Sequence, residues 1–437
     1  MKKALFIAYY FPPSGGGGVK RPTKFVKYLS KYNWQSVVLT APENSYTLRD
    51  NKFIHELPND LKIIRVRPLI SKKKADQFRK DSLKGIVANS ENIKGIRNKV
   101  LWKLKEWLMI PDVQVTWIPF ALPRALRAIR KYKIRVIWTK CPPYSMLVLG
   151  ALLKMLSGRP WVIDLSDPWT IASYNYFPNR HIKKINAIIE KILFRYADKI
   201  VTVAENIVED YCRTYPVIPK EKYNVITNGF DPDDLENVET FEQKKFTICY
   251  TGRVDLGNRD PVNFFKALNH LIGERPEVKE HLQVLFVGGG GDYWQATVNE
   301  YNLRGIVKFI GNVSHEESIK YQFSSHLLLL IGTGSKYEQT GKIFEYLVAE
   351  KPILCLLSRE TPAAEIVKKT NTGSIVSNDH IDDISVTIYS FYLKFNKHIP
   401  LGELRDKNEI MKYNWIYHAE NLGRIFDSVT AKNNIEY

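Results

Sequence analysis

Cysteine and histidine are scarce in this sequence, and neither forms a metal-binding pattern. The 437 residues include four cysteines and nine histidines, with no Cys-x-x-Cys, His-Glu-x-x-His or zinc-type spacing among them. Most of the cysteines fall in apolar segments, so we interpret them as small core residues in a reducing compartment rather than as disulfide partners. They are Cys141, Cys212, Cys249 and Cys355. No protein-bound metal and no cofactor are expected.

Long hydrophobic runs are also missing. No window offers the roughly 18 uncharged apolar residues that a membrane-spanning helix needs. The first apolar run, residues 4–10, is short and ends in Phe11-Pro12-Pro13 without a cleavage-like site of small residues. It fits a first buried strand better than a signal peptide, and we expect a cytoplasmic protein.

Acidic residues are too few to balance the basic ones. There are 46 Asp and Glu against 64 Lys and Arg, a formal charge of +18, which favours polyanionic partners such as nucleic acid, anionic lipid or phosphorylated substrates. Part of the excess lies in residues 71–108, where many basic residues precede Trp102, Trp107 and Leu108. This insert fits either a solvated helix at the protein's edge or an anchor on an anionic membrane.

Two common nucleotide-binding motifs are incomplete. The four glycines of residues 15–18 follow the first strand, but no acidic residue ends the next strand, as a dinucleotide fingerprint requires. Gly341-Lys342 is followed by Ile343 and lacks the upstream glycine of a P-loop. The glycines of residues 15–18 fit either a flexible turn or a loop that points N–H groups at a ligand. A second cluster, residues 288–291, fits a tight turn and ligand contact equally.

What the sequence does contain is a regular alternation of strand-like and helical segments, which predicts an α/β protein with parallel sheets. We expect two doubly wound, Rossmann-like domains. The expected strands are residues 4–10, 36–40, 63–66, 136–139, 161–164, 199–203 and 223–226 in the first half, and 246–250, 284–287, 307–310, 327–331 and 352–356 in the second.

The domain boundary is expected near the turn cluster of residues 228–232 and the polar stretch that follows it. We predict a first domain over residues 1–235, which would bind the acceptor, and a second over residues 236–411, which would bind a nucleotide sugar. A final amphipathic segment, residues 412–437, could lie back on the first domain.

Cations and a carboxylate follow two segments of the second half. Arg253 and Arg259 come after the strand of residues 246–250, at the strand end where open α/β sheets bind ligands, and paired arginines can donate forked hydrogen bonds to a diphosphate. Lys342 and Glu345 lie in the first turns of a helix, whose amino terminus favours an anion or a hydroxyl-rich ligand. A solvated arginine and a helix-capping glutamate are the alternatives.

The first half has a pair of carboxylates at a strand end. Asp164 and Asp167 could orient an acceptor hydroxyl or act as a base, with Trp169 beside them. A packed Pro-Trp corner is the alternative.

Taken together, these segments resemble the retaining glycosyltransferases of family 4, with their two-domain GT-B architecture, and among them the bacterial members that make exopolysaccharide, capsule or lipopolysaccharide. The resemblance extends over nearly the whole chain. It rests on Tyr9-Tyr10-Phe11-Pro12-Pro13 with its glycine loop, Pro160 to Trp169, Thr227-Asn228-Gly229-Phe230-Asp231, Thr251-Gly252-Arg253 and Gly341 to Leu347.

The resemblance implies roles for individual residues. Two sheets would face each other across a cleft, with Arg253 at the diphosphate and Glu345 at ribose or sugar hydroxyls. The implied donor-binding residues are Gly16, Gly17, Gly252, Asn312, Val313, Thr340, Gly341 and Glu345; Arg253, Arg259, Lys342 and Asp167 would be catalytic, and Asp164 and Trp169 would lie on the acceptor side.

The sequence departs from the family pattern at three places. Many relatives have two glutamates with seven residues between them, whereas Glu338 and Glu345 have six. Arg259 stands where relatives have a lysine, and Ser166 or Asp167 where many have a histidine.

These features predict a metal-independent hexosyltransferase, retaining by resemblance, that moves a sugar from a UDP- or GDP-type donor to a saccharide or lipid-linked acceptor. It would act in cell-surface polysaccharide synthesis at the inner face of a bacterial plasma membrane. The alternatives are a nucleotide-sugar epimerase of the same fold and, from another class, a nucleic-acid-binding protein, although no recognised nucleic-acid module is present.

Overall fold

The chain folds as two compact units. The computed structural model describes residues 1–46, 48–70, 107–172, 175, 177, 179–235, 238–402 and 405–432. The first unit is Met1–Thr227 together with Trp415–Tyr437, and the second is Asn228–Asn414. Most of the basic insert of residues 71–108 lies outside the described residues.

The division falls after Thr227 rather than at residue 235, because the turn cluster is built into the second unit. The Asn228 N–H donates to Gln339 Oε1 at 3.0 Å, and the Phe230 N–H donates to the carbonyl of Tyr413 at 3.0 Å. These bonds attach both ends of the second unit to its body.

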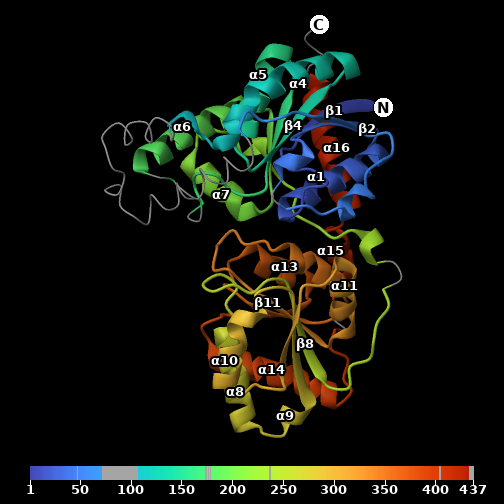
Figure 1. Ribbon diagram of the computed structural model, residues 1–437, viewed down its shortest axis with the longest axis vertical. Coiled ribbons are helices and arrows are strands. Elements are labelled where there is room, and N and C mark those ends of the chain that lie inside the picture. Colours follow the sequence, from blue (N-terminus) through green and yellow to red (C-terminus); the bar gives the residue numbers. More distant parts are fainter. Residues whose placement is uncertain are drawn as a thin grey trace. The chain divides into compact units, whose positions relative to one another are not determined.

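The first unit contains a parallel sheet of seven strands in the order β3-β2-β1-β4-β5-β6-β7 (Figure 1). The chain order reverses between β1 and β4, as in a doubly wound fold. The strands are β1 (Lys2–Ile7), β2 (Trp34–Thr40), β3 (Lys62–Arg65), β4 (Val136–Cys141), β5 (Trp161–Leu165), β6 (Lys199–Thr202) and β7 (Tyr223–Val225), and the main helices are α1 (Gly17–Tyr28), α4 (Ile118–Tyr132), α5 (Ser145–Ser157), α6 (Arg180–Tyr196), α7 (Glu205–Thr214) and α16 (Trp415–Lys432).

Helices α1 and α16 cover one face of this sheet. The Phe6 and Trp138 rings lie 4.3 Å apart on that face, and Trp415 of α16 meets Phe25 of α1 edge to face at 5.5 Å. The carboxyl-terminal segment, red in Figure 1, thus completes the core of the first unit.

On the opposite face α5 lies very close to the sheet. The Trp161 Nε1–H donates to Thr139 Oγ1 at 2.8 Å, and a Cβ at Gly150 would stand 2.4 Å from that nitrogen. Only glycine allows this approach, so Gly150 sets the distance between α5 and strands β4 and β5.

The second unit has a parallel sheet of six strands in the order β10-β9-β8-β11-β12-β13. One apolar cluster joins one face to α8 and α14, and another joins the other face to α12 and α13. The strands are β8 (Phe246–Thr251), β9 (Leu282–Val287), β10 (Val307–Gly311), β11 (Leu327–Ile331), β12 (Ile353–Leu356) and β13 (Gly373–Val376), and the helices are α8 (Val262–Glu274), α9 (Val278–His281), α10 (Gln295–Glu300), α11 (His315–Ser324), α12 (Gly341–Val348), α13 (Pro362–Thr370), α14 (Ile381–Asn396) and α15 (Lys407–Met411).

Both doubly wound sheets were expected from the alternation of segments, and the fold class is confirmed. Strand β13 was not expected: its four residues are too few for a clear pattern, and it is recognised only by its pairing with β12.

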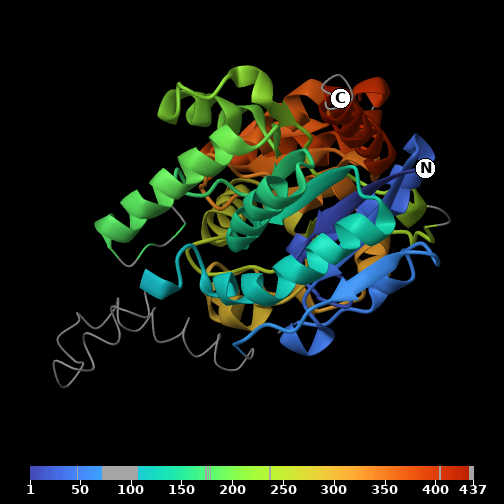
Figure 2. The same cartoon turned by 90° about the horizontal axis from the view of Figure 1, so that it is seen from above.

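Several apolar side chains of the first unit are exposed. Trp107 and Leu108 are the last two residues of the basic insert, and Ile188 and Ile192 belong to α6, the long green helix at the left of Figure 2. Among the described residues, no helix combines the length and the apolar character needed to cross a bilayer.

Candidate functional site

The predicted donor residues gather at one edge of the second sheet. Strand β8 lies in its middle, with β9 on one side and β11 on the other, so the chain order reverses between β8 and β11. Ligands of open α/β sheets bind at the carboxyl ends of strands beside such a reversal. The loops that carry Arg253 and Glu338 follow these two strands.

The loop after β8 is held by the glycines of residues 288–291. The Gly252 N–H donates to the carbonyl of Val287 at 2.8 Å. A Cβ at Gly288 would lie 2.0 Å from the Gly252 carbonyl oxygen, and one at Gly290 would lie 2.1 Å from that of Val254. The second glycine cluster is therefore required for loop packing, whatever ligand the loops contact.

The two arginines differ in their surroundings. Arg253 is exposed and its Nε–H donates to Asp255 Oδ1 at 2.6 Å. Arg259 is half-buried, and its charge acts on the Tyr250 hydroxyl and on the Glu338 carboxyl. Arg253 can therefore change partner to reach an incoming anion, whereas Arg259 faces a carboxylate of the same unit.

Glu345 is almost buried on α12. Its Oε2 accepts from Lys342 Nζ at 3.0 Å and from Gln322 Nε2 at 3.3 Å, and His315 Nδ1 lies 4.0 Å from Oε1. Thr340 caps the helix by accepting from the Lys342 N–H at 3.4 Å. Glu345 thus accepts hydrogen bonds from two other side chains and does not cap the helix.

A second layer of polar groups ties this helix to the end of β8. The Tyr346 hydroxyl accepts from the Thr251 N–H at 2.9 Å, and Gln322 Nε2 donates to Thr251 Oγ1 at 3.2 Å. These contacts fix the base of the Arg253 loop. Sequence reasoning missed Gln322 and Tyr346, because a lone glutamine and a tyrosine on an apolar helix face carry no pattern.

Glu338 is the carboxylate whose role the family spacing left open. It is 7% exposed, and its Oε2 accepts from the Thr333 N–H at 2.6 Å. Its Oε1 is buried with no hydrogen-bond partner in the described part of the chain. Burial raises the pKa of Glu338, while the Thr333 N–H and the charge of Arg259 lower it.

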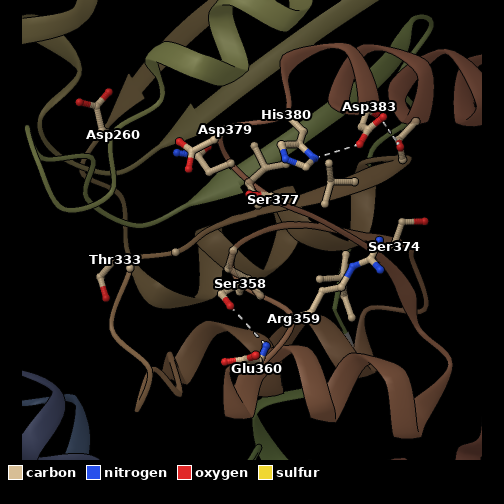
Figure 3. Close-up of a pocket in the computed structure, with 18 of the residues that line it drawn as sticks. Asp260, Thr333, Ser358, Arg359, Glu360, Ser374, Ser377, Asp379, His380 and Asp383 are labelled. Carbon is tan, nitrogen blue, oxygen red and sulfur yellow. Dashed lines mark hydrogen bonds and ion pairs between the residues drawn. The ribbon is translucent and has the colours of Figure 1, made fainter.

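The loop that holds Glu338 also borders a cavity of about 980 Å³ (Figure 3). The cavity lies at the carboxyl ends of β11, β12 and β13, with Thr333 and Ser358 on its wall and the His380–Asp383 pair, 3.2 Å from Nδ1 to Oδ2, at another side. Polar and apolar groups share the lining about equally, with Ser374 and Asp379 among the polar residues and Leu356 and Val376 among the apolar ones.

The remaining donor prediction of the second unit concerns Asn312 and Val313, which follow β10. Asn312 Oδ1 would lie 3.1 Å from a Cβ on Gly289, so this segment meets the glycine loop. The structure brings together in the second unit the predicted residues Gly252, Arg253, Arg259, Asn312, Val313, Thr340, Gly341, Lys342 and Glu345. Their contact with a donor stays a prediction.

The other predicted residues belong to the first unit. Gly16, with φ of 97°, precedes α1, and Gly17 opens the helix with no side chain capping it. Both glycines are exposed, and nothing lies within 4 Å of a Cβ built on either. This loop is open to a ligand.

Asp164, which was predicted on the acceptor side, is paired with an arginine of the same unit. It is fully buried, and Arg21 donates to its Oδ1 from Nε at 2.8 Å and to its Oδ2 from Nη2 at 2.9 Å. The Arg21 guanidinium is also buried and reaches the carbonyl of Thr227 at 2.9 Å. The pair joins α1 to β5, and an acceptor contact for Asp164 stays a prediction.

Trp169 is also packed within the first unit. It is 1% exposed, its ring stacks on Tyr144 at 4.7 Å, and its N–H donates to the Tyr211 hydroxyl at 2.8 Å. This packing agrees with the alternative of a packed Pro-Trp corner, and a contact of Trp169 with the acceptor stays a prediction. Asp167, by contrast, is exposed at the end of β5 and remains available to an acceptor.

The two units, each with a doubly wound parallel sheet, have the GT-B class of fold. Residues 86–234 match the sequence profile of Glycosyltransferase Family 4. A comparison with curated proteins found no match. The family match and the fold support a glycosyltransferase, as the sequence predicted.

Solved structures share the whole fold at low identity. Sucrose-phosphate synthase from Thermosynechococcus elongatus is 16% identical, with a TM-score of 0.61 over 99% of this chain and 100% of that one. Anabaena Alr3699/HepE in complex with UDP is 14% identical, with a TM-score of 0.63 over 98% and 100%. UDP-GlcNAc 2-epimerase from Methanocaldococcus jannaschii is 14% identical, with a TM-score of 0.56 over 98% and 100%. These likenesses establish the fold alone.

Proposed function

We propose that this protein transfers a sugar from a nucleotide-diphosphate sugar to a saccharide or lipid-linked acceptor. The observation that carries the proposal is the site at the chain reversal of the second sheet, where exposed Arg253 lies after β8 and nearly buried Glu345 lies near the start of α12. Guanidinium groups suit a diphosphate, and a carboxylate suits the hydroxyls of ribose. A UDP complex of the same fold supports a uridine donor.

The difficult event in such a transfer is departure of the nucleoside diphosphate while the sugar carbon becomes oxocarbenium-like. Cations placed in advance lower this barrier because they stabilise the negative charge that develops on the leaving group. We assign this task to Arg253, Arg259 and Lys342, without a metal ion. The leaving phosphate can itself accept the acceptor proton, so Asp167 would orient the acceptor rather than deprotonate it.

Product analysis tests the proposal against the epimerase alternative. The protein is incubated with UDP- and GDP-sugars, with and without candidate saccharides and lipid-linked sugars. We expect a glycoside and free nucleoside diphosphate in an acceptor-dependent reaction, with retained anomeric configuration and activity that survives EDTA. An epimerised nucleotide sugar formed without acceptor would establish the alternative.

A lipid-linked acceptor would require the enzyme to reach a membrane surface. Besides the insert of residues 71–108, α6 offers a suitable face: Ile188 and Ile192 are 51% and 60% exposed, with Lys184 and Lys191 exposed beside them. Apolar side chains flanked by lysines bind anionic interfaces. Flotation with liposomes should recover more protein when phosphatidylglycerol is present, and Ile188→Ser with Ile192→Ser should reduce recovery. Equal recovery from neutral and anionic liposomes would reject membrane contact.

A further inference from the structure

A lysine that sequence reasoning did not single out lies beneath the glycine loop of the first unit. Lys140 is near the end of β4 and only 4% exposed. Among the described residues it forms no hydrogen bond and no ion pair within 4.0 Å, and the opposite charge that acts on it most strongly is that of Asp167. The stem of Lys140 is buried while its Nζ still reaches solvent. A nearly buried cation with no ion pair is costly, so its presence needs an explanation.

The neighbouring carboxylates do not provide it. Asp164 is paired in register with Lys140 on the adjacent strand, but Arg21 occupies both of its oxygens. Asp167 is exposed and is not in an ion pair with Lys140. Burial lowers the pKa of Lys140, and the charges of Asp167 and Asp164 act against this effect.

The Lys140 ammonium points instead to the start of α1. A Cβ built on Gly18 would have Lys140 Nζ as its nearest neighbour, at 3.8 Å. Helix α1 has 12 residues, no acidic residue in its first turn and no side-chain cap. Its amino terminus therefore offers free N–H groups and partial positive charge to an anion, directly over a buried cation.

We propose that Lys140 and the amino terminus of α1 at Gly16–Gly18 form a binding site for an anionic group, a phosphate or a carboxylate, of the acceptor. The assignment to the acceptor rests on the proposed function. The family resemblance implied that Gly16 and Gly17 bind the donor. Under the proposed function the donor diphosphate already has Arg253, Arg259 and Lys342 in the second unit, so we assign the two glycines to the acceptor. The acceptor would thus be an acidic or phosphorylated saccharide rather than a neutral one, and Lys140 would determine that specificity.

The decisive variant is Gly18→Asp, which places a carboxylate in the proposed anion site. In Gly18→Asp the new carboxylate starts from a Cβ 3.8 Å from Lys140 Nζ, so it can pair with the ammonium, and an acid in the first turn of a helix is itself stabilising. Gly18→Asn is the matched control, with the same shape and no charge. Inorganic phosphate, glucuronate and UDP are titrated separately into each purified protein by calorimetry.

We expect Gly18→Asp to weaken the binding of phosphate or glucuronate on the order of tenfold or more, the scale of losing a hydrogen bond to a charged group, while Gly18→Asn loses clearly less. Lys140→Met should show the same loss, and Asp167→Asn, which removes the nearest free carboxylate, should strengthen binding. Arg253→Ala should leave phosphate and glucuronate binding at this site unchanged. Which of the two anions binds more tightly identifies the acidic group.

Three results would overturn the proposal. One is equal anion affinity in Gly18→Asp and Gly18→Asn. Another is loss of UDP affinity in Lys140→Met as large as the loss for phosphate, which would assign the site to the donor. The third is the absence of any phosphate or glucuronate binding to the unaltered protein, which would mean that Lys140 serves only to balance the charge of Asp167. None of these measurements needs turnover, so they remain informative if the transferase proposal fails.

Discussion

The two carboxylates at the end of β5 should respond to substitution in opposite ways. Asp164 is fully buried against Arg21, whereas Asp167 is exposed. In Asp164→Asn the charge of Arg21 stays buried beside Lys140 without its counter-ion. Breaking a buried pair on one side costs about 3–5 kcal/mol, and here two guanidinium nitrogens and both carboxylate oxygens take part. Asp167→Asn should change the unfolding free energy much less. The Asp167 side chain is open to solvent and has no hydrogen bond or ion pair with a described residue, although burial raises the pKa of its carboxyl and the charge of Lys140 lowers it.

Urea unfolding followed by tryptophan fluorescence measures the difference in unfolding free energy between the two variants, and it reports mainly on the first unit. Eight of the nine tryptophans belong to the residues of the first unit, with Trp294 the exception. At a slope of roughly 3 kcal/mol per molar urea, a loss of about 3–5 kcal/mol moves the midpoint by about 1 M or more. The double variant Arg21→Met, Asp164→Leu should recover most of the loss, because a buried pair can be replaced by apolar groups at little cost. The reasoning is refuted if Asp164→Asn unfolds at the same urea concentration as Asp167→Asn.

Three further predictions concern the second unit. Arg253→Ala should lower the initial transfer rate about a hundredfold or more, the scale of losing one oxyanion donor; an unchanged rate in the purified variant would remove Arg253 from the mechanism. Burial raises the pKa of Glu338, so the folded state binds a proton more tightly than the unfolded state. The free energy of unfolding should therefore fall as pH rises from the ordinary glutamate range through the raised pKa. Glu338→Gln should abolish this part of the pH dependence in urea unfolding followed by circular dichroism, and identical pH profiles of the variant and the unaltered protein would contradict the prediction. Tyr346→Phe leaves the buried Thr251 N–H without its acceptor, which should lower the free energy of unfolding by about 1–3 kcal/mol. It should also raise the KM for the donor more than it lowers kcat. A donor KM equal to that of the unaltered enzyme would show that the Arg253 loop does not depend on this hydrogen bond.

Strand-end positions were predictable from the sequence, but the direction of each side chain was not. Arg253 follows an apolar strand and Asp164 ends one, and the sequence predicted ligand contact for both. In the structure Arg253 is exposed in a loop, while Asp164 lies on the strand face that α1 covers, paired with an arginine 143 residues away. Nothing local to either segment carries that distinction, because the pairing depends on how α1 lies over the sheet.

The same reason explains what was missed. Tyr346 and Gln322 reach Thr251 over 95 and 71 residues of sequence, and Lys140 faces a loop more than a hundred residues earlier. Each looks ordinary in its own segment.

By itself the sequence determined the class of protein: alternating strands and helices can bury their apolar faces only as parallel sheets between helix layers, and cations after a strand belong at the ligand-binding edge. Tertiary structure alone decided which charges are available at that edge. Asp164 finds its counter-ion Arg21 on another element, and this pair contributes to stability. Lys140 has no ion pair among the described residues, and we propose that it is available to a ligand. Contacts between distant segments set this difference, and no local pattern encodes them.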